Sequence, residues 1–198
     1  MPQIVLASNN QGKIKEFREI FKNLNIEILP QSEFHVPPVD EPYCTFLENA
    51  LHKARHCARF TKLPTLADDS GICVKSLDGA PGVFSARYAG NFSNDELNNQ
   101  KLIQELINIK DRQAYFYCIL ILIRNENDPQ PIIADGIING EIVDKPFGDN
   151  GFGYDPHFYL EKYKKTMAQL SQTEKNQISH RSLAIKALYH KLSNSQII

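Results

Sequence analysis

The sequence predicts an α/β or α+β fold built on a mixed β-sheet. Segments with helical spacing of apolar residues alternate with short apolar segments that are typical of strands. The longest apolar run, residues 114–123, is too short for a membrane helix and rich in β-forming residues, so we expect a central strand. The 198 residues, 42% of them hydrophobic, suffice for one domain with two lobes that share a sheet. We therefore expect a single domain over residues 1–198.

The first half of the chain is predicted to run from strand to helix to strand and then into a long loop. The expected elements are a strand over 3–8, a helix over 13–24, a strand over 26–29 and a loop over 31–44. Thr45 and Glu48 have capping-box spacing, so a helix should begin there and end near Phe60. We expect Asn49 and Lys53 on the flank of its buried face. The residues predicted to form that face are Phe46, Leu47, Ala50, Leu51, Ala54 and Ala58.

The second half is predicted to contain long strands and short capped helices. A pair of strands is expected around Asp68 and Asp69, followed by a glycine- and proline-rich loop over 78–91. A second capping box, Ser93 to Glu96, predicts a helix that ends near residue 107. The remaining expected elements are strands over 113–124 and 131–144, a loop over 145–156, a short helix capped by Ser171, and a terminal helix over 181–192.

Charge and cysteine content exclude several classes of protein. The net charge is −1 and no long run of one sign occurs, so neither nucleic acid nor a membrane surface is an expected partner. The four cysteines form no CxxC pair, and the N-terminus does not have the pattern of a signal peptide. We therefore expect reduced thiols and a cytoplasmic protein.

The segment ASNNQGK, residues 7–13, follows the first strand and opens the first helix. Backbone N–H groups and the helix dipole at such a position favour a phosphate, with Asn10 and Lys13 as additional donors. The alternative is that Ser8, Asn9 and Asn10 only turn and cap the chain. The segment is not a Walker loop, because it has one glycine and Ile14 follows the lysine.

Three carboxylates, Glu41, Asp68 and Asp69, are candidates for a metal site. Adjacent strand residues point to opposite faces, so Asp68 and Asp69 should not have the same role. Mg²⁺ takes one or two carboxylates together with substrate phosphates, which suits Glu41 and one aspartate. The alternative is that they are ordinary turn acids. His52 and His56 have zinc-pair spacing, but their helix face is expected to be exposed, so we do not assign them a metal.

Two further polar segments are candidates for ligand contacts. In GDNGFGYDP, residues 148–156, Phe152 and Tyr154 lie among glycines, which suits stacking on a nucleobase or a glycine-rich turn with buried rings. Near the last helix, hydrogen-bond donors gather without an acid among them. These donors are Lys175, Ser179, His180 and Arg181. They could bind a ligand or simply cap the helix. Lys53 could likewise reach a phosphate or remain a solvated lysine.

Taken together and in order, six stretches resemble the ITPase family, also called the Ham1 or RdgB family, which hydrolyses non-standard purine nucleoside triphosphates. The stretches are LASNNQGKIKEF, TFLENALHKA, LADDSG, GAPGVFSARYAG, GFGYDP and ISHR, and they span residues 6–181. The resemblance implies an elongated, two-lobed α/β fold of the Ham1/Maf-like type. In that fold a long curved mixed sheet is flanked by helices and a central cleft divides the lobes. It also implies a homodimer.

The resemblance further implies hydrolysis of dITP, ITP or XTP between the α and β phosphates, with Mg²⁺ as cofactor. Asp69 would be the general base and, with Glu41, a metal ligand. The residues implied to contact the purine nucleoside triphosphate are Ser8, Asn9, Asn10, Gln11, Gly12, Lys13, Lys53, Ser70, Phe152, Gly153, Tyr154, Asp155, Lys175, His180 and Arg181. The family pattern usually has glycine where this chain has Tyr43, so the placement of Glu41 depends on the structure.

Two other functions fit parts of the sequence. A nucleotide-binding regulatory module would use the same contacts without turnover, but it would not need a base beside a metal. A phosphatase that forms an aspartyl-phosphate would have a D-x-D motif after a strand, whereas here the two acids are adjacent.

Overall fold

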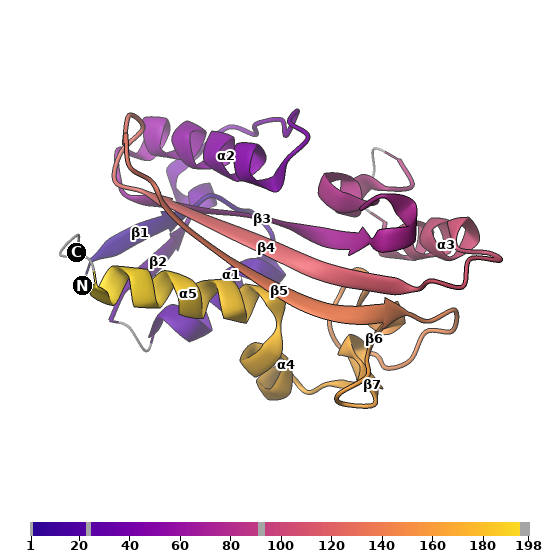
Figure 1. Cartoon of the computed structure of the whole chain (residues 1–198). Coiled ribbons are helices and arrows are strands. Elements are labelled where there is room, and N and C mark those ends of the chain that lie inside the picture. The colour runs from indigo at the N-terminus through magenta and orange to yellow at the C-terminus, as the bar shows by residue number, and fades with distance from the viewer. Residues whose placement is uncertain (1, 23–24, 91–93, 195–198) are drawn as a thin grey trace. The chain divides into compact units, whose positions relative to one another are not determined.

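The computed structural model describes residues 2–22, 25–90 and 94–194. Within these residues, strands form one mixed sheet in the order β2-β1-β3-β4-β5-β6-β7, flanked by helices (Figure 1), which confirms the α/β class. The strands are β1 (Gln3–Leu6), β2 (Glu27–Pro30), β3 (Thr65–Val74), β4 (Gln113–Ile123), β5 (Ile132–Ile142), β6 (Phe158–Leu160) and β7 (Lys165–Thr166). The α-helices are α1 (Gln11–Lys22), α2 (Phe46–Thr61), α3 (Asp95–Glu105), α4 (Gln172–Ile178) and α5 (His180–Asn194).

The chain divides into two compact units, and three strands contribute residues to both. Unit 1 comprises 1–69, 118–136 and 181–198, and unit 2 comprises 70–117 and 137–180. The division falls within β3 between Asp69 and Ser70, and within β4 and β5. Each unit has its own apolar core.

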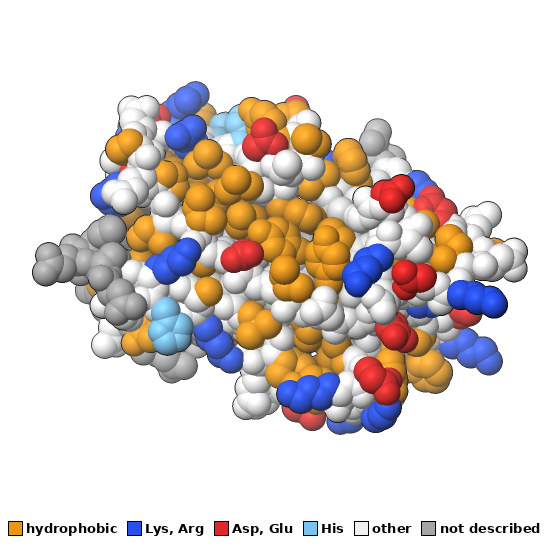
Figure 2. Space-filling view, viewed as in Figure 1, with side chains coloured by type: hydrophobic (Ala, Val, Ile, Leu, Met, Phe, Trp, Pro, Cys, Tyr) orange, Lys and Arg blue, Asp and Glu red, His pale blue; other side chains and the backbone are white. Residues whose placement is uncertain are grey.

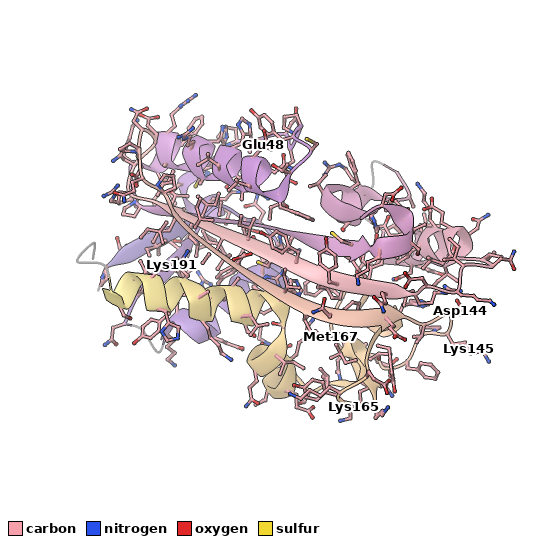
Figure 3. The ribbon with its side chains drawn as sticks, in the orientation of Figure 1. Glu48, Asp144, Lys145, Lys165, Met167 and Lys191 are labelled. Atoms are coloured by element: carbon pink, nitrogen blue, oxygen red, sulfur yellow. The ribbon has the colours of Figure 1, made fainter. Side chains whose placement is uncertain are left out.

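Unit 1 is a parallel βα arrangement. β1 pairs in parallel with both β2 and β3. Phe17 of α1 and Leu188 of α5 pack with Leu120 of β4 in one core cluster, while α2 covers the other face of the sheet (Figure 1). Lys191 of α5, labelled in Figure 3, donates to the carbonyl of Ile133 at 2.6 Å. Apolar burial on the α1–α5 face therefore holds the helices that carry Lys13 and Arg181.

Unit 2 is built on antiparallel strands. β5 pairs with β6, and β6 pairs with β7. Phe158 packs on Phe116 with ring centroids 4.5 Å apart, in a cluster that also includes Leu102 of α3 and Met167, which Figure 3 labels. This cluster anchors the loop that connects β5 to β6, which includes residues 148–156.

Helix α2 begins where the sequence predicts, but its buried face differs from the prediction. The Thr45 side chain accepts the N–H of Glu48, which is labelled in Figure 3, at 3.2 Å. Leu47 is 41% exposed, although we expected it to be buried. Asn49, expected on the flank, is fully buried. The pattern of apolar residues did not predict this face correctly, because the polar side chain of Asn49 occupies one of its buried positions.

Two other expectations need correction, and two strands were not predicted. Asp68 and Asp69 lie within one ten-residue strand, β3, and not between a pair of strands or at a strand end. Nearly every residue of β3 is buried, and the two acids have charged partners, so the strand continues through them. The predicted cap Ser93 lies outside the described residues; the cap of α3 is Asn94, which accepts the N–H of Leu97. The short strands β6 and β7 were not predicted.

The surface shows no large patch of one charge on the face in Figure 2, where basic and acidic side chains are interspersed. Among the described residues, no helix is long and apolar enough to cross a membrane.

The reactivity of the cysteines tests whether three of the thiols are buried as the structure shows. All four are free; Cys44 is exposed, whereas Cys57, Cys73 and Cys118 are buried. Burial raises the pKa of Cys57 to about 11 and that of Cys118 to about 12. Because the thiolate is the reactive form, we expect Ellman's reagent at pH 8 to label one thiol quickly in the folded protein and all four in urea. The fast reaction should disappear in Cys44→Ser, and two or more fast thiols in the wild type would contradict the packing.

Candidate active site

The adjacent carboxylates of β3 lie at the centre of a buried ionic cluster in unit 1. Asp68 is 1% exposed and Asp69 is 5% exposed. Two buried carboxylates in sequence are costly unless each has a charged or hydrogen-bonding partner. The cations within 4.0 Å of each carboxylate differ. Lys13 and Arg181 pair with Asp68, whereas Lys53 pairs with Asp69. This division follows from the alternation of side chains along a strand.

Asp68 is paired with cations from two helices. Lys13 of α1 places Nζ 2.8 Å from Oδ2 of Asp68, and Arg181 of α5 places Nε 4.0 Å from the same oxygen. Burial alone would raise the pKa of Asp68, but Lys13, Arg181 and Lys53 outweigh it and hold that pKa well below its usual range. Arg181 also pairs with Glu16 of α1. Asp68 is therefore ionised and fixed at neutral pH.

Asp69 shares the ammonium of Lys53 with Glu41. Lys53 Nζ lies 2.7 Å from Oε1 of Glu41 and 3.6 Å from Oδ1 of Asp69. Burial raises the pKa of Asp69 to about 6, since the lowering by Lys53 only partly offsets it and Glu41 adds to the rise. Burial would lower the pKa of Lys53, but Asp69, Asp68 and Glu41 together raise it, so Lys53 stays protonated.

The donor set of Glu41 and Asp69 fits Mg²⁺. Both side chains supply hard carboxylate oxygens, and both approach the same cation, the Lys53 ammonium. Mg²⁺ is usually bound by one or two carboxylates together with waters and substrate phosphates. Among the described residues, no group of three or more His, Cys, Asp or Glu side chains could form an all-protein metal site.

The turn before α1 both caps the helix and presents polar groups. Asn10 Oδ1 accepts the N–H of Lys13 at 3.1 Å, and Ser8 Oγ accepts the N–H of Asn10 at 3.2 Å. The capping role that the sequence suggested for Asn10 is therefore present. The neighbouring polar residues Asn9, Gln11 and Gly12 are exposed.

Asn49 supports the loop that carries Glu41, and sequence reasoning gave it no role. Its Oδ1 accepts the N–H of Tyr43 at 3.0 Å, and its Nδ2 donates to the carbonyl of Tyr43 at 3.1 Å. Both main-chain groups of Tyr43, which stands where the family usually has glycine, are thus held by one side chain. A buried asparagine on an otherwise apolar helix face is the signal that could have identified it.

Unit 2 contains the second group of candidate residues, around the loop 148–156. Asp155 Oδ2 accepts from Lys175 Nζ at 2.6 Å and from the N–H of Phe152 at 3.0 Å. The Lys175 ammonium also lies 4.8 Å from the ring centroid of Phe152. Lys175 and Asp155 are buried, whereas Phe152 is 41% exposed. The loop therefore presents one aromatic side chain to solvent above a buried ion pair.

The glycines of this loop are required by close packing and backbone conformation. A Cβ at Gly151 would lie 2.1 Å from Oδ2 of Asp155, so no other residue fits there. Tyr154 is buried, and its hydroxyl donates to the carbonyl of Ser85 at 2.8 Å. Ser85 Oγ in turn accepts the N–H of Ile72 in β3 at 2.9 Å. The loop is thus connected to β3 within unit 2.

Three other predicted residues are divided between the units. His180 is buried and stacks on Phe116, with centroids 4.9 Å apart and ring planes 14° apart. Arg181, the next residue, belongs to unit 1 and pairs there with Glu16 and Asp68. Ser70, half-buried, follows Asp69 as the first residue of unit 2.

Comparison with known proteins identifies the family. The sequence model of the Ham1 family matches residues 4–191. The chain belongs to the Ham1 family. A relative from Chromobacterium violaceum, named dITP/XTP pyrophosphatase, is 55% identical over 190 residues, which are 96% of each chain. One of the same name from Nitrosomonas europaea is 52% identical over 198 residues, covering 100% of this chain and 98% of the relative.

Solved structures of Ham1 proteins have the same fold as this chain. A HAM1 protein from Coxiella burnetii superimposes with a TM-score of 0.93 at 48% identity, covering 98% of this chain and 100% of that one. The Ham1 protein of Staphylococcus aureus gives 0.87 at 44% identity, covering 96% and 98%. The family resemblance of the six sequence stretches is therefore confirmed.

The buried ionic cluster predicts a large stability effect at Asp68. In Asp68→Asn, Lys13 and Arg181 lose a carboxylate partner, so the free energy of unfolding should fall by about 3 kcal/mol. Because the folded-state pKa of Asp68 lies below its unfolded value of about 3.9, the wild type has this stabilisation above that pH. It loses the stabilisation as the pH falls toward the folded-state pKa, whereas the variant should lack this acid sensitivity. Urea unfolding monitored by circular dichroism measures both effects.

Glu126→Gln is the matched control for this measurement. Glu126 pairs with Arg59 and Lys62, both about two-thirds exposed. Neutralising such a surface carboxylate should leave the urea midpoint nearly unchanged. Equal midpoints for the two variants would show that the Asp68 cluster does not stabilise unit 1.

Proposed function

We propose that this Ham1 chain hydrolyses non-standard purine nucleoside triphosphates, namely dITP, ITP and XTP, to the monophosphate and pyrophosphate. The observation that carries the proposal is the approach of Glu41 and Asp69 to one half-buried lysine, Lys53, in unit 1. This arrangement supplies two carboxylates for a metal and a cation for phosphate. The names of the curated relatives, dITP/XTP pyrophosphatase, support the substrate class.

Residues of unit 1 are assigned to the triphosphate. Ser8 to Lys13 would contact phosphate oxygens through the start of α1 and the Lys13 ammonium. Lys53 would exchange a carboxylate partner for a phosphate oxygen. Glu41 and Asp69 would hold Mg²⁺, which supplies positive charge to the phosphate oxygens when bound.

Asp69 is assigned as the general base. In the protein without metal, burial raises the pKa of Asp69 to about 6, and a carboxylate placed beside a bound water can take its proton. The water oxygen forms a bond to the α-phosphorus, and the bond from that phosphorus to the bridging oxygen breaks. Pyrophosphate leaves with the electron pair, and the proton passes from water to Asp69 and then to solvent.

Residues of unit 2, together with Arg181 of unit 1, are assigned to the base and sugar, and Ser70 is assigned a contact with the substrate. The base contacts are assigned to Phe152, Gly153, Tyr154, Asp155, Lys175, His180 and Arg181. The exposed ring of Phe152 is a surface on which a purine stacks. The donors near the last helix suit the 6-oxo acceptor of hypoxanthine and xanthine, and a donor that faces the amino group of adenine would remain unpaired. ITP should therefore be preferred to ATP.

The remaining proposals concern assembly and location. The family resemblance favours one two-lobed domain over residues 1–198 that acts as a homodimer. The four free thiols suit the reducing conditions of the cytoplasm, where we propose that the enzyme acts.

Identifying the phosphate product tests the proposed reaction. The purified protein is incubated with ITP and Mg²⁺, and the products are separated by anion exchange. We expect inosine monophosphate and pyrophosphate in equal amounts. Orthophosphate as the first product would indicate a phosphatase, and bound but unaltered ITP would indicate a binding module; either result would overturn the proposal.

Asp69→Asn tests the assignment of the base. The amide can neither take the proton of water nor bind Mg²⁺ as well, so kcat for ITP should fall by roughly 10³-fold or more. The circular dichroism spectrum should remain that of the wild type. Asp135→Asn, which neutralises an exposed acid of unit 1, is the control and should keep full activity. Activity of Asp69→Asn within tenfold of the wild type would remove Asp69 from the mechanism.

A further inference from the structure

Gly153 is held by two side chains of helix α3 for which the sequence predicts no role. Its N–H donates to Oδ2 of Asp95 at 2.7 Å, and its carbonyl accepts from Nδ2 of Asn99 at 2.9 Å. Asp95 and Asn99 lie four residues apart on α3 and therefore project from the same side of the helix. Both main-chain groups of one glycine are thus fixed by one helix, 54 or more residues earlier in the chain.

The backbone conformation of Gly153 explains why hydrogen bonds to its main chain matter. Its φ is +63°, in the left-handed region, and a Cβ placed there would contact nothing within 4 Å. Glycine is therefore needed here because its backbone adopts a positive φ readily. A side chain at this position would not clash with its surroundings. A flexible glycine between Phe152 and Tyr154 would allow both rings to move unless its peptide groups are held.

The other side-chain hydrogen bonds of the loop hold the residues on either side of Gly153. Phe152 is tied to Asp155, and Tyr154 is tied to Ser85, on either side of Gly153. The bonds from Asp95 and Asn99 fix the turn between these two anchors. The backbone that follows Phe152 is therefore fixed by hydrogen bonds from α3.

We infer that Asp95 and Asn99 are positioning residues that hold Gly153, and through it the Phe152 ring, in the orientation that receives the purine base. This inference rests on the proposed function, because it assigns the base to loop 148–156. The two side chains act on the substrate through Gly153. Their loss should weaken binding of the base and leave the hydrolytic step, assigned to residues of unit 1, nearly intact.

Kinetics and amide hydrogen exchange of matched variants test the inference. Loss of a hydrogen bond to a charged group corresponds to about tenfold, so Asp95→Ala should raise KM for ITP about tenfold, with kcat within about twofold of the wild type. Asn99→Ala should raise KM about fivefold. In both variants, amide exchange in a peptide covering residues 150–156 should be faster by a similar factor.

Two further variants separate positioning from effects on the helix. Glu96→Ala removes the same charge from the same first turn of α3, and Glu96 lines the same pocket of about 580 Å³ as Asn99, but its side chain pairs with Gln100. Glu96→Ala should leave KM and loop exchange unchanged. Asp95→Asn keeps an oxygen that accepts the N–H of Gly153 and should restore a KM near that of the wild type.

The outcomes distinguish this inference from the proposed function. Unchanged exchange in residues 150–156 of Asp95→Ala and Asn99→Ala would overturn the positioning role, whatever the activity. Faster exchange with an unchanged KM would show that the loop does not receive the base. Equal effects of Asp95→Ala and Glu96→Ala would reduce the role to helix stability and overturn the inference. Absence of pyrophosphate from ITP with the wild type would instead contradict the proposed function, and with it the assignment of the base to this loop.

Discussion

The constraint on which unit 1 depends is the burial of two carboxylates at consecutive positions of β3. Each carboxylate needs a nearby cation. Adjacent side chains of a strand point to opposite faces, so the two carboxylates pair with different cations. Lys13 from α1 and Arg181 from α5 approach Asp68, while Lys53 from α2 approaches Asp69. Three helices are therefore tied to one strand through charge as well as through apolar packing. The result is one carboxylate with a lowered pKa beside one with a raised pKa, as expected where one acid is structural and the other reactive.

In each unit, an asparagine holds the backbone of a loop that carries candidate site residues. Asn49 of α2 binds both main-chain groups of Tyr43, and Asn99 of α3 binds the carbonyl of Gly153, whose N–H is bound by Asp95. Loops have few apolar contacts of their own, so hydrogen bonds from a packed helix are an effective way to order them. This explains how loops rich in proline or glycine can present Glu41 or an aromatic ring in a defined position.

Local sequence signals predicted much of the fold and part of the candidate site. The capping box at Thr45 correctly placed the start of α2, and the β-rich run at 114–123 correctly placed β4. The single strand through Asp68 and Asp69 was missed, because two acids before a serine and a glycine resemble a turn. The pairing of Arg181 with Glu16, 165 residues apart, has no local signal; only the folded chain brings such side chains together.

Asp68 and Asp69, although adjacent and both buried, are expected to have separate roles. Binding of Mn²⁺, followed by electron paramagnetic resonance in the presence of a non-hydrolysable α,β-imido analogue of ITP, tests this claim most directly. Asp68→Asn and Asp69→Asn each remove one charge and keep the shape of the side chain, so they are matched to each other. Asp69→Asn should lose most of the Mn²⁺ binding because it removes a proposed carboxylate ligand, whereas Asp68→Asn, kept folded at low temperature, should retain that binding within about threefold. Equal loss of Mn²⁺ in both variants, or retention in both, would contradict the division of roles.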